Sequence, residues 1–136
     1  MRKINMIFIV DDDPITVFGI RKMLGTVADC KNILEFPNGE RAMEQIKQII
    51  LKKEELPDII FLDINMPIMD GWEFLEEFVN LPITRMINIH IVTSSIDQND
   101  KERSDNFKSI THHPIIFNSK PISLNEIKEI TGTIAY

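Results

Sequence analysis

The sequence predicts an α/β fold, a doubly wound parallel sheet of five strands with helices on both faces. Two observations indicate this fold class. Short, almost continuous apolar runs, typical of strands buried on both faces, alternate with stretches whose apolar residues recur every three or four positions, as on one face of a helix. The alternation runs through the whole chain without a repeat or a linker, and parallel strands need crossover helices between them.

The expected strands follow from the apolar runs, and the helices from their start signals. Four strands are predicted by apolar runs at 6–10, 59–62, 86–92 and 115–117. A fifth strand, which comes second along the chain, is predicted by a weaker run around Ile33 and Leu34. The polar stretch 97–108 predicts a mostly exposed fourth helix. The expected N-cap residues of the other helices are Asp13, which precedes a proline, Asn38, and the capping-box residues Asp70 and Ser123.

The apolar periodicity of four helices predicts which side chains face the sheet. Spacings of three and four residues separate the apolar positions in each of these segments, which is the period of one helix face. The expected buried faces consist of Val17, Ile20, Leu24 and Val27; of Ala42, Ile46 and Ile49; of Trp72, Leu75 and Val79; and of Leu124, Ile127 and Ile130.

Length and composition limit the possible functions. The chain has 136 residues, 43% of them hydrophobic and 26% charged, which fits one ordinary domain over residues 1–136. Its net charge of −6 argues against direct binding of nucleic acid. No apolar stretch has the length of a membrane helix, and three aspartates stand where a signal peptide would carry small residues. The single cysteine, Cys30, is expected to be a packing residue of a cytoplasmic protein.

Polar side chains follow the carboxyl ends of four expected strands. They are Asp11, Asp12 and Asp13; Asp63; Thr93, Ser94 and Ser95; and Asn118, Ser119 and Lys120. In an open parallel sheet, ligands bind at this edge near the point where the strand order reverses. If the first and third strands are neighbours, three carboxylates lie close together and repel one another. We therefore expect a cation at this edge.

The expected cation is Mg²⁺, since oxygen ligands on short strand ends suit it. Lys120 and Thr93 add a positive charge and a hydroxyl that can bind a phosphoryl group, and a central carboxylate can act as a nucleophile. Aspartates after strands are often only turn or cap residues, and Asp13 and Asp70 have that explanation. Asp63 has none, because a stiff Ile-Asn-Met-Pro segment follows it instead of a helix start.

The pattern resembles the receiver domain of response regulators in two-component signalling. Four motifs carry the resemblance, in the order and spacing of that family and across essentially the whole chain. They are FIVDDDP, PDIIFLDINMPIMDG, IVTSS and NSKP. The resemblance implies a flavodoxin-like strand order 2-1-3-4-5 and a single stand-alone domain without an effector domain. It also implies that Asp63 accepts a phosphoryl group from a histidine kinase or a histidine phosphotransfer protein. The downstream protein is unknown, and the chain is expected to be a monomer or a weak dimer without membrane contact.

The same resemblance implies a set of metal ligands. Asp12 and Asp63 would coordinate Mg²⁺ directly, together with the backbone carbonyl of Asn65, and Asp11 would act through water. A cis peptide bond is implied between Lys120 and the proline that follows it.

Three further residues correspond to the family's switch. Thr93 matches the switch hydroxyl, Lys120 the invariant lysine and Phe117 the switch aromatic. Phosphorylation brings charge and acceptor oxygens that Thr93 and Lys120 move to meet, while Phe117 fills the vacated space. The expected output is a changed surface on the fourth helix, the fifth strand and the fifth helix.

The chain departs from the family pattern at the approach to the fifth strand. SITHHPII replaces a small-residue turn there, which leaves the shape of the output surface open, and Phe117 lacks the hydroxyl of a tyrosine. His112 and His113 are expected to be exposed loop residues rather than phosphohistidine or metal-binding sites. His90, inside a strand, is expected to be structural.

Other functions compete with the phosphoacceptor switch. A haloacid-dehalogenase-like Mg²⁺ phosphatase also uses a strand-end aspartate, but it needs a second aspartate two positions on, where this chain has Asn65, and a cap domain. A binding module that has lost phosphorylation is disfavoured by the complete acidic set. A receiver fragment of a hybrid histidine kinase is the remaining alternative. We expect no turnover of a separate substrate.

Overall fold

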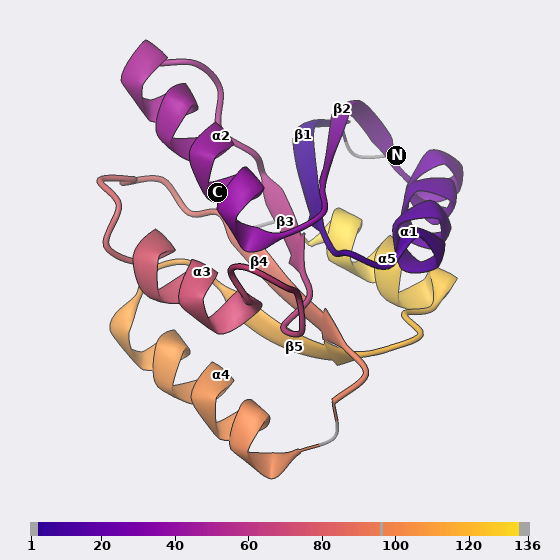
Figure 1. Cartoon of the computed structure of the whole chain (residues 1–136). Coiled ribbons are helices and arrows are strands. Elements are labelled where there is room, and N and C mark those ends of the chain that lie inside the picture. The colour runs from indigo at the N-terminus through magenta and orange to yellow at the C-terminus, as the bar shows by residue number, and fades with distance from the viewer. Residues whose placement is uncertain (1–2, 96, 134–136) are drawn as a thin grey trace.

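Strands and helices alternate along the computed structural model, which describes residues 3–95 and 97–133. The strands are β1 (Lys3–Val10), β2 (Asp29–Phe36), β3 (Ile59–Leu62), β4 (Asn88–Thr93) and β5 (Ile115–Ser119). The helices are α1 (Pro14–Val27), α2 (Gly39–Lys52), α3 (Gly71–Phe78), α4 (Gln98–Ile110) and α5 (Leu124–Gly132). The strands form one five-stranded parallel sheet in the order β2-β1-β3-β4-β5, which confirms the predicted fold class and order (Figure 1). Residues 1, 2 and 134–136 of the predicted domain lie outside the described part.

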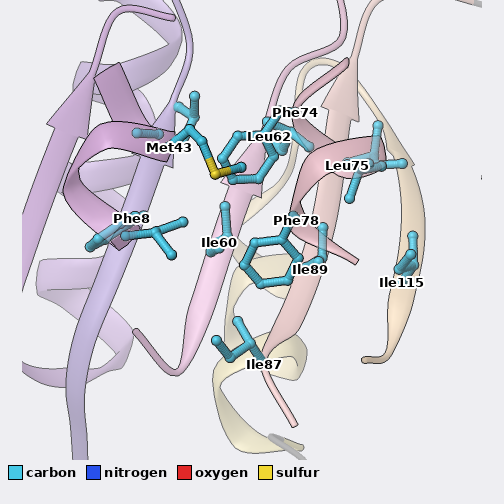
Figure 2. Packing of buried hydrophobic residues seen from close by; sticks show 14 of the residues in the cluster. Phe8, Met43, Ile60, Leu62, Phe74, Leu75, Phe78, Ile87, Ile89 and Ile115 are labelled. Atoms are coloured by element: carbon cyan, nitrogen blue, oxygen red, sulfur yellow. The ribbon is translucent and has the colours of Figure 1, made fainter. Parts of the chain in front are cut away.

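Helices cover both faces of the sheet and enclose two apolar clusters. Phe8 and Val10 of β1 belong to the cluster under α2 and α3, whereas Ile7 and Ile9 belong to the cluster under α1 and α5. Figure 2 shows the first cluster, in which aromatic side chains of α3 pack on aliphatic residues of β3 and β4. The central strand β3 is buried along its whole length, as expected for a strand covered on both faces.

The predicted N-caps are confirmed. The side chains of Asp13 and Asn38 accept the N–H of Ile15 and Arg41, and those of Asp70 and Ser123 form complete capping boxes. The cis Lys120–Pro121 bond is also confirmed. In the part of the chain that the structure describes, no helix has the length and apolar character to cross a bilayer.

The predicted buried face of α5 is wrong at its first residue. Leu124 is 44% exposed, while Ile127 and Ile130 are buried as expected. Ile122, which precedes the N-cap Ser123, is buried in the same cluster as Ile127. These two residues occupy the positions of a hydrophobic staple, so Ile122 takes the place in the core that the periodicity assigned to Leu124.

The prediction that His113 is an exposed loop residue is also wrong. His112 is exposed as predicted, but His113 is 3% exposed and its ring lies 5.0 Å from that of Phe78. Its Nδ1 accepts the backbone N–H of Ile87 at 3.0 Å. Burial, with a smaller effect of His112, lowers the pKa of His113 to about 4, so its ring is neutral at pH 7 and can accept this bond. A backbone donor just before β4 therefore keeps this loop residue inside. His90 in β4 is buried, in agreement with a structural role.

Candidate phosphoacceptor and metal site

The pairing of β1 with β3 brings two buried carboxylates together. Val10 pairs with Leu62, so Asp11 and Asp63 are the next residues of neighbouring strands, and the N–H of Asp63 donates to the carbonyl of Val10 at 2.9 Å. Both aspartates are 5% exposed. The order and register of β1 and β3 place them side by side, and the sequence had predicted that these strands are neighbours.

Lys120 joins these carboxylates from the end of β5. Its Nζ lies 3.0 Å from Oδ2 of Asp11 and 3.5 Å from Oδ2 of Asp63. Its backbone N–H donates to the carbonyl of Thr93 at 2.8 Å, which fixes the chain after β5 against the end of β4. The ammonium group of Lys120 is thereby held where it can pair with both carboxylates.

Asp12 completes an acidic cluster. Asp11, Asp12 and Asp63 each offer a carboxylate oxygen, and these atoms lie within 4.8 Å of one another. Asp11 and Asp63 are buried, whereas Asp12 is exposed, so the cluster opens to solvent on the side of Asp12. A set of oxygen ligands with one open side fits a hard divalent cation that keeps water or substrate oxygens.

The other predicted site residues lie beside Asp63 in the chain or in β4 and β5. Oδ1 of Asp63 accepts the N–H of Ile64 at 2.8 Å, and the backbone N–H of Asn65 also bonds to this carboxylate. Thr93 is fully buried at the end of β4, and its hydroxyl oxygen accepts the N–H of Ser95 at 3.2 Å. Phe117 is half-buried in β5 and packs against the cluster under α2 and α3. It is the predicted site residue that belongs to the core rather than to the polar group.

Comparison with known proteins identifies the family. The family model described as response regulator receiver domain matches residues 7–131. The chain belongs to this receiver family. A protein-glutamate methylesterase/protein-glutamine glutaminase of Methanosarcina acetivorans is 31% identical over 86 residues, which are 63% of this chain but only 23% of that protein. The matched segment therefore makes up less than a quarter of this relative.

Solved structures share the fold of the receiver domain over almost its whole length. A two-component response regulator of Cytophaga hutchinsonii is 24% identical and superposes with a TM-score of 0.80, with 96% of each chain covered. The phosphorylated cyanobacterial phytochrome response regulator RcpA is 25% identical, with a TM-score of 0.71 and coverage of 93% of this chain and 89% of that one. The predicted resemblance is thus confirmed as family membership.

Burial and like charge raise the pKa values of both buried carboxyl groups in the receiver site. Burial raises the pKa of Asp63 most, the neighbouring Asp11 carboxylate raises it further and Lys120 opposes both, which leaves it at about 6. Burial also raises the pKa of Asp11. Asp63 is therefore ionised for the most part at neutral pH, but at a cost that a bound cation would reduce.

Asp63→Asn is expected to stabilise the metal-free receiver domain by about 1–2 kcal/mol at about pH 8. A carboxyl whose pKa is about 6 in the fold, against an ordinary value of 3.8, makes folding less favourable above that pKa. The amide keeps the oxygen that accepts the N–H of Ile64. The gain should shrink as the pH falls from about 6 to about 4, where the carboxyl gains its proton in both states. Urea unfolding without Mg²⁺ across this range measures it, and equal stabilities at pH 8 would contradict it.

Gly71 is a sterically restricted position beside Asp63 that the sequence analysis did not single out. Its N–H donates to the carbonyl of Ile64 at 2.9 Å, and a Cβ at this position would lie 2.4 Å from the carbonyl oxygen of Asp63. The loop from Asp63 to Asp70 can therefore fold back on Asp63 because residue 71 has no side chain. The signal in the sequence was the glycine directly after the N-cap Asp70.

Proposed function

We propose that this receiver domain is a phosphoacceptor switch of a two-component system or phosphorelay, with Asp63 as the acceptor. The observation that carries the proposal is the environment of Asp63: its carboxylate is buried at a strand end, beside Asp11 and within 3.5 Å of Lys120 Nζ. A solitary structural carboxyl would not need two acidic neighbours and a lysine. The expected donor is a phosphohistidine on a histidine kinase or a histidine phosphotransfer protein.

In the proposed reaction, a carboxylate oxygen of Asp63 attacks phosphorus. A P–O bond forms, the P–N bond to the donor histidine breaks, and its electron pair stays on the ring nitrogen, which then takes up a proton. Lys120 offsets the negative charge of the phosphoryl oxygens, and the Thr93 hydroxyl can donate to one of them. Asp11, Asp12, Asp63 and the backbone carbonyl of Asn65 would hold Mg²⁺. When bound, the ion would supply further positive charge to the phosphoryl group.

The proposed output is a changed surface. The phosphoryl group on Asp63 would attract the side chains of Thr93 and Lys120, and the Phe117 side chain on β5 would fill the space that they leave. The changed surface would comprise α4, β5 and α5 and act on a protein partner, with the domain as a monomer or a weak dimer. No turnover of a separate substrate is part of this proposal.

Intact mass spectrometry tests the proposal. Wild-type protein with Mg²⁺ and acetyl phosphate should gain the mass of a single phosphoryl group, and Asp63→Asn should gain none. Asp70→Asn is the matched control, since Asp70 belongs to the same loop, only caps α3, and asparagine caps equally well. An adduct on Asp63→Asn, or none on wild type, would sink the proposal. Continuous hydrolysis of a phosphate ester would favour the phosphatase instead.

A further inference from the structure

One tryptophan of α3 contacts three side chains of α4. Trp72, in the first turn of α3, is 3% exposed, and its Nε1–H donates to Oδ1 of Asp100 at 3.1 Å. Its ring stacks on Phe107, with centroids 5.9 Å apart and planes 2° from parallel, and the guanidinium of Arg103 lies 5.0 Å from the ring centroid. Three residues on one face of α4, at helical spacing, thus rest on a single side chain.

Helix α4 buries few side chains of its own. Ser104 is its one buried residue, and the Ser104 hydroxyl has no hydrogen-bond partner among the described residues. Apolar burial is the usual anchor of a surface helix, and α4 lacks an apolar face. In Figure 1, α4 lies below α3 at the periphery of the molecule. Helix α4 packs beside β5, and its polar and aromatic side-chain contacts to α3 all converge on Trp72.

The same contacts continue to the phosphoacceptor site. Oδ2 of Asp100 accepts the hydroxyl of Ser95 at 2.5 Å, and the N–H of Ser95 donates to the hydroxyl oxygen of Thr93 at 3.2 Å. A continuous chain of hydrogen bonds therefore runs from Thr93 through Ser95 and Asp100 to Trp72. Because the Thr93 oxygen accepts from Ser95, its own proton is directed elsewhere and can be donated.

We propose that Asp100 is a positioning residue of the phosphoacceptor site, which acts through Ser95 on the hydroxyl of Thr93. This inference rests on the proposed function of Asp63. Trp72 fixes one carboxylate oxygen of Asp100, and the other fixes Ser95, so that the Thr93 hydroxyl is oriented before a phosphoryl group arrives. Coupling of this kind is reciprocal: a shift of Thr93 toward a phosphoryl group must alter the Asp100–Trp72 contact that holds α4.

The chain reports on this coupling itself, because Trp72 is its single tryptophan. After Mg²⁺ has been added as a baseline, acetyl phosphate should change the tryptophan fluorescence of wild type at the rate at which the mass adduct forms. Asp63→Asn should show no change. Asp100→Ala and Ser95→Ala should each form the adduct about three- to tenfold more slowly, with a smaller fluorescence change.

Two controls separate positioning from a general structural effect. The double variant Ser95→Ala/Asp100→Ala should be no slower than the slower single variant, because both substitutions break one chain of bonds. Asp105→Ala removes an exposed acid of the same helix that pairs with Lys108, and it should behave as wild type. Thermal unfolding of each variant shows that it is folded at the assay temperature.

The outcomes distinguish this inference from the proposed function. A wild type without an adduct overturns both. If wild type forms the adduct without a fluorescence change, or if Asp100→Ala and Ser95→Ala react at the wild-type rate, the inference alone is overturned. Additive slowing in the double variant would also contradict it, because it would show two independent roles.

Discussion

Lys120→Met is expected to slow phosphorylation of Asp63 by about a hundredfold and to destabilise the fold by about 2–3 kcal/mol at about pH 8. The lysine Nζ lies 3.0 Å from Asp11 and 3.5 Å from Asp63, and its side chain is only 17% exposed. Methionine has a similar length and flexibility but no charge, so both carboxylates would lose their countercharge. Asp63 would then hold its proton more tightly and be a poorer nucleophile near neutral pH.

The pH dependence of this loss has a definite sign. Burial lowers the pKa of Lys120, but the Asp11 and Asp63 carboxylates outweigh it and raise the pKa overall. As the pH falls below the Asp63 pKa of about 6, that carboxyl becomes neutral and needs no countercharge. The destabilisation should therefore be largest above pH 6 and shrink below it. Urea unfolding at several pH values and a mass-spectrometric time course with acetyl phosphate measure the two effects.

Lys108→Met provides the matched control for Lys120→Met. Lys108 pairs with Asp105 at 3.3 Å on the exposed side of α4, where an ion pair contributes little. Its loss should change stability by less than about 0.5 kcal/mol and leave phosphorylation unchanged. Phosphorylation of Lys120→Met at the wild-type rate would show that the lysine has no part in the transfer.

Gly71→Ala is expected to cost about 2–3 kcal/mol of stability and to reduce phosphorylation. The added methyl group would lie 2.4 Å from the Asp63 carbonyl oxygen and 2.8 Å from the Cα of Ile64. Both are backbone atoms, which cannot rotate away, so Asp63, the proposed acceptor, would itself have to shift. A displacement of this kind misaligns the carboxylate with respect to Lys120 and the acidic cluster.

Gly19→Ala is the comparison for Gly71→Ala. Gly19 lies inside α1, and a Cβ there would meet no atom within 4 Å. Alanine should therefore stabilise the fold by about 0.5–1 kcal/mol, because it reduces the entropy lost on folding. The unfolding midpoint should fall in Gly71→Ala and rise in Gly19→Ala. The yield of the phosphoryl adduct should fall in Gly71→Ala and stay unchanged in Gly19→Ala. A Gly71→Ala protein as stable and as active as wild type would refute the close approach.

The sequence predicted the features of this receiver domain that follow from topology and charge. Asp11, Asp63 and Lys120 could be placed together because parallel strands end at one edge of the sheet, whatever the side chains in between. The caps Asp13 and Asp70 could be predicted because a cap depends on a few consecutive residues. Family resemblance added the roles proposed for Asp63 and Lys120 but not the environment of these side chains.

Features that depend on atoms far apart in the chain could not be predicted in this way. His113 is inside because the N–H of Ile87, far from it in sequence, needs its ring nitrogen. The restriction at Gly71 arises from a loop that returns to within 2.4 Å, and no local rule gives such a distance. Asp100 looked like one more charge on a solvated helix until the structure placed Trp72 beside it.

The sparse anchoring of α4 also bears on how a receiver domain of this kind can acquire new partners. A helix that contributes one buried residue to the core is under little pressure to keep its sequence, apart from the residues that touch Trp72. Most other side chains of α4 can change at small cost to folding. If α4 belongs to the output surface, as proposed above, that surface can diverge between related proteins while the acidic cluster and the sheet stay the same.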